Sequence, residues 1–94
     1  MATFLLFGKY SVKAMKGMSS QRTEEANKLI EKFGGEVKSI YALLGEKDLV
    51  IVATFPGIEE AVKSSIAITK LTGIVFTTSE AVPVEDFDRM ISEI

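Results

Sequence analysis

The sequence predicts an α+β sandwich, in which two helices cover one face of a four-stranded antiparallel sheet. Three observations lead to this fold class. Residues 40–55 contain two apolar, β-rich runs that meet at the polar turn of residues 45–48, which is the pattern of a β-hairpin. A further apolar run and a stretch with helical periodicity lie on each side of this hairpin. The order is therefore βαββαβ, the split βαβ or ferredoxin-like arrangement, with a short helix after it at the C-terminus.

The N-terminal part of the chain is expected to contain a strand, a connector and a helix. Residues 3–10 are apolar and aromatic without alternation, as in a strand that is covered on both faces. Residues 11–17 have the serine and glycine ends of a connector with room for one helical turn. A longer helix is predicted to begin at a cap on Ser19 or Ser20 and to end at the glycine pair of residues 34–35.

The C-terminal part is predicted to add a helix, a strand and a final short helix. Residues 58–72 present a broad apolar surface at helical spacing, and Gly73 ends that helix. Residues 74–81 begin apolar and become polar, which indicates the fourth strand. Pro83 opens the last helix, and its apolar residues recur at i, i+3, i+4 and i+7: Phe87, Met90, Ile91 and Ile94.

The two faces of the hairpin differ, and the difference suggests self-association. We predict strands at residues 37–44 and 49–55 and a two-residue loop, so that Leu44 lies opposite Leu49. One face is then wholly apolar and suits the helices, whereas the other mixes aliphatic with polar residues: Ser39, Tyr41, Leu43, Val50, Val52 and Thr54. Such a face is unusual as free surface. Either the C-terminal helix folds back over it or, as we prefer, a second copy of the chain covers it.

The composition indicates a single domain, residues 1–94, and excludes several chemistries. The chain is 47% hydrophobic and 26% charged, so we expect an ordered domain with one modest core. The net charge of −2, from 11 basic and 13 acidic residues, argues against binding to nucleic acid or to an acidic membrane. Cysteine and histidine are absent, which removes disulfides, zinc–thiolate sites, thiol nucleophiles and the commonest general base.

Sequence motifs for cofactors and for nucleophilic catalysis are absent as well. Neither G-x-G-x-x-G nor the Walker spacing occurs, and no Ser-x-x-Lys or Gly-x-Ser-x-Gly pattern is present. We therefore expect no cofactor, no metal and no assigned catalytic residue. The apolar run before Lys9 is too short for a signal peptide or a membrane span, so we expect a cytoplasmic protein.

Five residues near the strand ends are the candidate ligand-binding residues: Lys9, Tyr10, Tyr41, Asp48 and Thr77. A tyrosine in these positions either fills an interface between subunits or forms the wall of a pocket. Asp48 closes the hairpin turn, where aspartate commonly accepts backbone N–H bonds, although a buried aspartate of shifted pKa would act as a base. Because the first and fourth strands should be neighbours, Lys9 and Thr77 would either line one cleft mouth or simply face water.

Several segments of the chain together resemble the GYD domain family of small bacterial and archaeal proteins. They are Phe-Gly-Lys-Tyr-Ser at 7–11, Arg-Thr at 22–23, Phe-Gly-Gly at 33–35, Tyr-Ala-Leu-Leu-Gly at 41–45, Asp-Leu-Val at 48–50 and Leu-Thr-Gly at 71–73. The family pattern has a tyrosine directly before the aspartate of the hairpin turn, where this chain has Lys47, while Gly45 and Asp48 match. The resemblance implies a ferredoxin-like subunit related to dimeric α/β-barrel proteins, and it implies no particular reaction.

Two functions fit the sequence. We favour a non-catalytic, oligomeric module that binds a small ligand or regulates another process, because catalytic residue types are lacking and one sheet face is mixed. The alternative is a cofactor-independent enzyme of the dimeric α/β-barrel kind, monooxygenase- or isomerase-like, which would use Tyr10, Tyr41 and Asp48 in an enclosed pocket. An RNA-recognition module would need exposed aromatics flanked by basic residues on the central strands, and residues 49–55 contain no basic residue.

Overall fold

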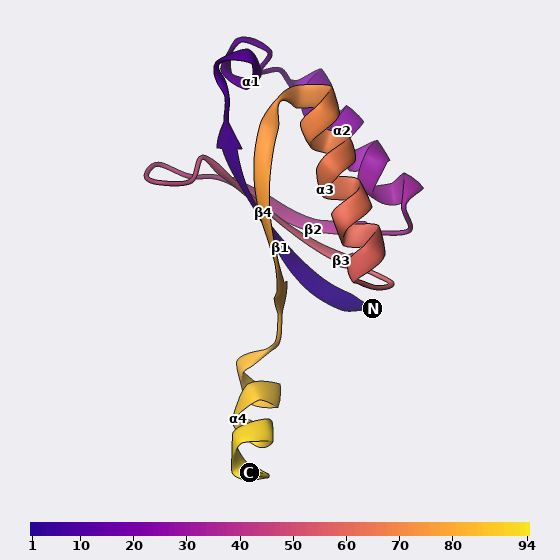
Figure 1. The fold of residues 1–94 in the computed structure, drawn as a ribbon, viewed down its shortest axis with the longest axis vertical. Helices are drawn as coiled ribbons and strands as arrows, with labels where there is room; N and C mark the ends of the chain where they lie inside the picture. The colour runs from indigo at the N-terminus through magenta and orange to yellow at the C-terminus, as the bar shows by residue number, and fades with distance from the viewer.

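The computed structural model describes residues 1–94 and confirms the predicted ferredoxin-like α+β fold (Figure 1). Its four strands form one antiparallel sheet in the order β2-β3-β1-β4. The elements are β1 (Ala2–Tyr10), α1 (Val12–Lys16), α2 (Ser20–Lys32), β2 (Glu36–Ala42), β3 (Leu49–Phe55), α3 (Ile58–Thr72), β4 (Ile74–Ala81) and α4 (Val84–Ser92). No helix is both long enough and apolar enough to cross a membrane.

Serine caps and glycine ends define the helices, as the sequence predicts. Ser11 Oγ accepts a hydrogen bond from the Ala14 amide at 3.0 Å and starts α1. Ser19, rather than Ser20, caps α2, since its Oγ accepts a hydrogen bond from the Arg22 amide at 3.1 Å. Gly73 ends α3 in the left-handed region, with φ of 81°, and its amide donates to the Thr69 carbonyl.

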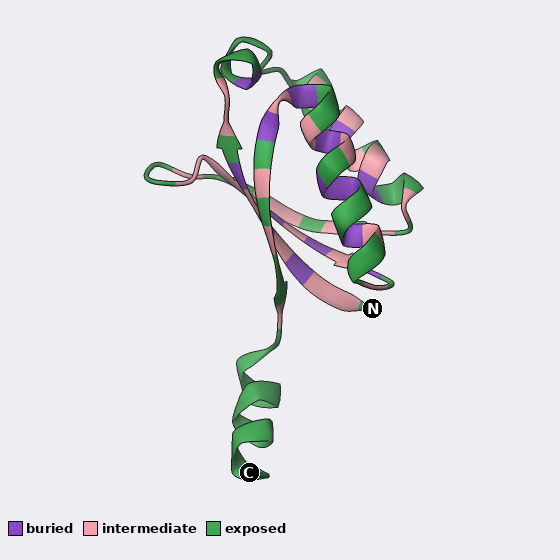
Figure 2. Ribbon diagram, in the orientation of Figure 1, coloured by how far each residue is buried: buried purple, intermediate pink, exposed green.

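The core lies between the sheet and the helices α2 and α3, which cover the same face (Figures 1 and 2). Alternate residues of the central strands point into it, so Phe4 and Leu6 of β1 meet Ile51 and Phe55 of β3. The rings of Phe4 and Phe55 pack edge to face with centroids 5.8 Å apart. Both helices therefore cover the same face of the sheet, and no helix covers the other face.

The predicted two-residue hairpin loop is wrong. Strand β2 ends at Ala42, which pairs with Leu49, and Leu44 is fully exposed in the connecting loop. The loop is drawn toward β1 instead, because the Asp48 amide donates to the Gly8 carbonyl at 2.9 Å. The predicted pairing of Leu44 with Leu49 is thus displaced by two residues. An even displacement keeps Ser39 to Ala42 on their predicted faces, since the side-chain period of a strand is two. A bulge between Val37 and Ser39 then brings Val37 opposite Ala53, on the helix side of the sheet.

Helix α4 does not fold back over the open face of the sheet. It extends away from the end of β4 (Figure 1), and none of its residues is buried (Figure 2). The covering of the mixed face by the C-terminal helix, one of the two arrangements expected from the sequence, is therefore wrong for this chain. The apolar stripe of α4 is exposed to solvent instead, with accessible fractions of 55% for Phe87 and 54% for Ile91.

Candidate functional site

The loop between β2 and β3 gathers three of the five candidate residues at the end of the sheet where β1 finishes. Asp48 Oδ2 accepts a hydrogen bond from the Tyr10 amide at 2.8 Å, and Lys9 Nζ donates to the Glu46 carbonyl at 3.0 Å. Asp48 therefore accepts a backbone N–H bond, although from β1 rather than from its own turn. These contacts hold the loop against the last residues of β1.

Tyr10 and Lys9 diverge from there to opposite faces of the sheet. Tyr10 pairs with the buried Ile74 and faces the helices, whereas Lys9 pairs with the exposed Val75 and faces the open side. Thr77 also lies on the open side, where its hydroxyl accepts a 3.5 Å hydrogen bond from Lys47 Nζ. The five predicted residues therefore do not converge on one site.

The open face has an apolar centre framed by hydroxyl groups. Its register across the four strands gives one row of Tyr41, Val50, Phe7 and Thr77, and a second row of Ser39, Val52, Leu5 and Ser79. The four central side chains are only partly buried, because the sheet carries no helix on this side. Tyr41 lies at one edge of the first row and is 58% exposed, so it belongs to this face and not to a pocket.

A small pocket lies on the helix side of the sheet, below the ring of Tyr10. It has a volume of about 50 Å³, and most of its lining is apolar, including Ile51, Ile68 and Phe76. Its polar lining residues are Tyr10, Arg22 and Thr23, where the start of α2 crosses the end of β1. A cavity of this size has room for one or two groups of about the size of a water molecule, so most of any ligand would lie outside it.

Arg22 supplies the positive charge of this pocket. Its guanidinium carbon lies 5.6 Å from the centroid of the Tyr10 ring, which is a cation–π geometry, and its Nη1 donates to the Ala14 carbonyl. A guanidinium has five N–H donors in a planar fork, so donors remain for an anionic ligand. The cap of α2 at Ser19 fixes the first turn from which this side chain projects.

Sequence reasoning did not place Arg22 in the site, although it identified Tyr10. In the sequence, Arg22 stands out only as part of the Arg-Thr pair at 22–23 that resembles the family pattern. No spacing in the sequence links it to residue 10. The contact depends on the angle at which α2 packs over the sheet. Its nearest sequence signal is the capping serine at position 19, which predicts that Arg22 lies in the first helical turn.

Comparisons with known proteins agree with the fold and identify the family. In a search of solved structures, the leucine response regulatory protein LrpA of Mycobacterium tuberculosis matches with a TM-score of 0.58 and 12% sequence identity. The match covers 87% of this chain and 51% of LrpA, so the chain spans about half the length of that protein, and the likeness concerns the fold alone. No curated protein matches the sequence. The model of the GYD domain matches residues 4–91, and the chain therefore belongs to the GYD domain family.

Proposed function

We propose that this GYD domain is a non-catalytic, self-associating module that binds a small carboxylic acid with a short apolar body. The observation that carries the proposal is the position of Arg22, which lines an apolar pocket and whose guanidinium lies against the Tyr10 ring. A planar guanidinium binds a carboxylate through two parallel hydrogen bonds. The apolar lining behind it favours an aliphatic chain over a hydrated anion such as phosphate.

Thermal stabilisation by a panel of small carboxylates tests this proposal. A ligand that binds only the native state raises the melting temperature, and the panel includes short aliphatic acids and leucine, since LrpA is described as a leucine response regulatory protein. We expect stabilisation of the unaltered chain and a loss of affinity of about tenfold or more in Arg22→Gln. Lys28→Gln is the matched control, because it removes a cation from α2 outside the pocket.

Two results would count against ligand binding at Arg22. The first is that no acid of the panel stabilises the chain at millimolar concentration. The second is that Arg22→Gln and Lys28→Gln bind equally well, which would move the ligand to another part of the molecule.

Self-association through the open face is the second part of the proposal. The supporting observation is that Leu5, Phe7, Val50 and Val52 form the centre of a sheet face on which no helix of the chain lies. Pairing two such faces would bury these side chains, and burial of apolar surface is worth about 25 cal/mol per Å².

We propose the cytoplasm as the location of this assembly, which cell fractionation would test.

Light scattering and sedimentation at micromolar concentration test the oligomeric state. We expect a dimer or a larger oligomer, and we expect Val52→Asp to remove the contact through the sheet face and so lower the order of association, because the carboxylate would enter the centre of the paired faces. Val62→Asp, the same change on the outer surface of α3, is the control and should leave the association unchanged. A monomer for the unaltered chain would overturn this part of the proposal.

The enzymatic alternative is not supported by an observation in the structure. It needs Tyr10, Tyr41 and Asp48 to share one enclosed pocket, and only Tyr10 lines the pocket described above. Tyr41 lies on the open face, and one carboxylate oxygen of Asp48 accepts the Tyr10 amide. We therefore assign no reaction to these side chains.

A further inference from the structure

Helix α4 has an apolar stripe and no partner within its own chain. Phe87, Met90 and Ile91 of the helix and Ile94 just after it form the stripe. All four are exposed, and no residue of α4 is buried. An isolated helix shorter than about 12 residues is marginal in water, and most helices in proteins depend on packing of an apolar face. The nine residues of α4 therefore need a surface to pack against.

The C-terminal segment that contains this helix accounts for the net negative charge of the chain. Residues 84–94 contain four carboxylates and one arginine, a net charge of −3, whereas the other 83 residues carry ten basic and nine acidic groups, a net charge of +1. Glu93 pairs with Arg89 at 3.2 Å, but Glu85, Asp86 and Asp88 form no ion pair. A complementary partner would offer lysine or arginine beside an apolar strip.

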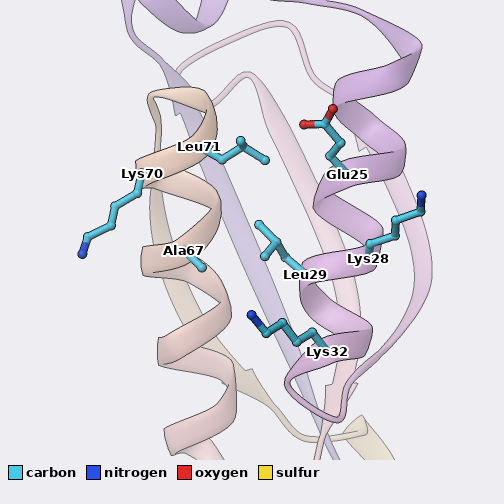
Figure 3. Close-up of a pocket in the computed structure, with 7 residues that line it drawn as sticks. All are labelled: Glu25, Lys28, Leu29, Lys32, Ala67, Lys70 and Leu71. Carbon is cyan, nitrogen blue, oxygen red and sulfur yellow. The ribbon is translucent and has the colours of Figure 1, made fainter.

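The groove between α2 and α3 has this character (Figure 3). Its floor is apolar, because Leu29 and Leu71 point toward one another across the gap and Ala67 lies beside them. Lys32 and Glu25 of α2 reach into the gap, whereas Lys28 of α2 and Lys70 of α3 extend from the outer flanks of the groove. The groove has a volume of about 520 Å³ and is open to solvent.

The three groove lysines are unpaired, like the carboxylates of α4. None of them takes part in an ion pair within the chain, and their only aromatic contact is that of Lys32 with the Phe33 ring at 5.9 Å. We propose that α4 of one copy of the chain docks in the α2–α3 groove of a second copy. This is the helix-in-groove mode of recognition, in which an amphipathic helix lays its apolar face along a hydrophobic groove.

The charges match on both sides of the groove. Asp86 and Asp88 are two residues apart in a helix, about 200° around its axis, so they flank the apolar stripe on opposite sides. With the stripe on the groove floor, one aspartate faces the α2 wall and the other faces the α3 wall. On the α2 side the unpaired Lys32 points into the groove, and on the α3 side the unpaired Lys70 extends from the outer flank, from which its long side chain would have to turn toward the docked helix.

A chain cannot seat α4 in its own groove. Only Val82 and Pro83 separate β4 from α4, and two residues reach about 7 Å at most. The groove opens on the outer side of the helix layer, and a helix with its side chains is about 10 Å thick. In addition, Ala67 and Leu71 lie shortly before the start of β4, whereas α4 follows its other end (Figure 1). The helix in the groove must therefore come from another copy.

The groove suits α4 better than the open sheet face does. The open face offers hydroxyl groups around its apolar centre, and its lysine at position 9 already donates to the Glu46 carbonyl. An acidic helix would find Lys9 and Lys47 there, and both already donate hydrogen bonds to groups of their own chain. Because α4 and the groove are different surfaces of one chain, the contact closes when copies exchange helices in a dimer or a ring, and otherwise it adds further copies.

Disulfide trapping tests the proposal in the full chain, which contains no cysteine of its own. One sample carries Ile91→Cys and a mass-tagged second sample carries Ala67→Cys, so a mixed disulfide forms only between two copies. We expect this mixed product to form at least tenfold faster than the product of Ile91→Cys with Leu5→Cys, which reports docking on the sheet face instead. Faster trapping at Leu5, or equal rates at the two positions, would overturn the proposal.

Charge reversal provides a second measurement that a folding defect cannot imitate. Lys32→Glu with Lys70→Glu should slow the mixed disulfide about tenfold at low salt, and Asp86→Lys with Asp88→Lys in the other sample should restore it. Failure of this restoration would also overturn the docking. Docking of α4 does not depend on association through the sheet face. We therefore expect Val52→Asp to leave the rate of the mixed disulfide unchanged.

Discussion

The carboxylate of Asp48 accepts a hydrogen bond from the backbone amide of Tyr10, with 2.8 Å between Oδ2 and the nitrogen. Pairing of β1 with β3 ends at Gly8 and Leu49, while Lys9 and Tyr10 continue to pair with β4. The bond to Asp48 therefore satisfies the Tyr10 amide where β3 no longer does. The ring of Tyr10 lies against Arg22, and the hairpin loop therefore helps to position the pocket on the other side of the sheet.

Removal of that carboxylate should destabilise the loop and the pocket together. We expect Asp48→Ala to lower the free energy of unfolding by about 1–2 kcal/mol, as for other hydrogen bonds to charged acceptors, and to weaken carboxylate binding. Asp48→Asn keeps an acceptor oxygen and should lose less. Urea unfolding measures the first effect, and hydrogen exchange of the Tyr10 amide reports the bond directly. Unchanged exchange in Asp48→Ala would contradict the assigned role.

Two neighbouring serines of α3 should respond in opposite directions to alanine. Ser64 Oγ is buried without a hydrogen-bond partner, so Ser64→Ala removes an unsatisfied group and improves helix propensity, with an expected gain of about 0.5–1 kcal/mol. Ser65 Oγ instead donates to the Ala61 carbonyl at 2.9 Å and lies 2.7 Å from Thr78 Oγ1.

Ser65→Ala should therefore lower stability, by about 1 kcal/mol, because it leaves the Thr78 hydroxyl of β4 without this partner. Thermal unfolding of the two variants in parallel measures the contrast. Equal effects of the two substitutions would show that Ser64 has a partner in solution, such as a water molecule.

A side chain at position 35 should be poorly tolerated. A Cβ atom on Gly35 would lie 2.5 Å from the Phe55 ring and 2.9 Å from Ile30, and both residues belong to the core. We expect Gly35→Ala to cost about 1–3 kcal/mol by overpacking. Gly57→Ala is the control, since its Cβ would meet only the flexible carboxylate of Glu60. Denaturant midpoints compare the two variants, and similar values would contradict the close packing at position 35.

Ending the chain after Ala81 should separate the role of α4 from the stability of the domain. Because no residue of α4 is buried, we expect the free energy of unfolding of the shortened chain to change by no more than about 0.5 kcal/mol under conditions that keep it monomeric. Calorimetry at low concentration measures it. A larger loss would show that α4 packs against its own domain in solution.

Local patterns predicted most of this fold because they are set by neighbours in the sequence. The alternation around Ile51 and Val52 assigned the two hairpin faces correctly, and Ser19 and Gly73 marked helix ends. The hairpin register was missed because the bond from the Asp48 amide to Gly8 joins residues far apart in sequence. Turn propensities at positions 45–48 contain no information about that contact.

The candidate site was less predictable for the same reason. Tyr10 was identified, but the sequence does not show that it faces the helices while its neighbour Lys9 faces the open side. Tyr41 and Thr77 lie on the opposite face of the sheet from Arg22, although all of them carry polar groups. Only the three-dimensional arrangement divides these side chains into a pocket and a sheet surface.

The hydroxyl frame of the open face has a consequence for the symmetry of any pairing. A two-fold axis brings each surface against a copy of itself, so a rim of like charges would repel its mate, whereas a hydroxyl both donates and accepts. Ser39 and Tyr41 at one edge and Thr77 and Ser79 at the other are thus self-complementary. Lys9 and Lys47 also reach this side of the sheet, but its centre carries no charge, so pairing there should depend on ionic strength less than the docking of α4, which should weaken as salt is added.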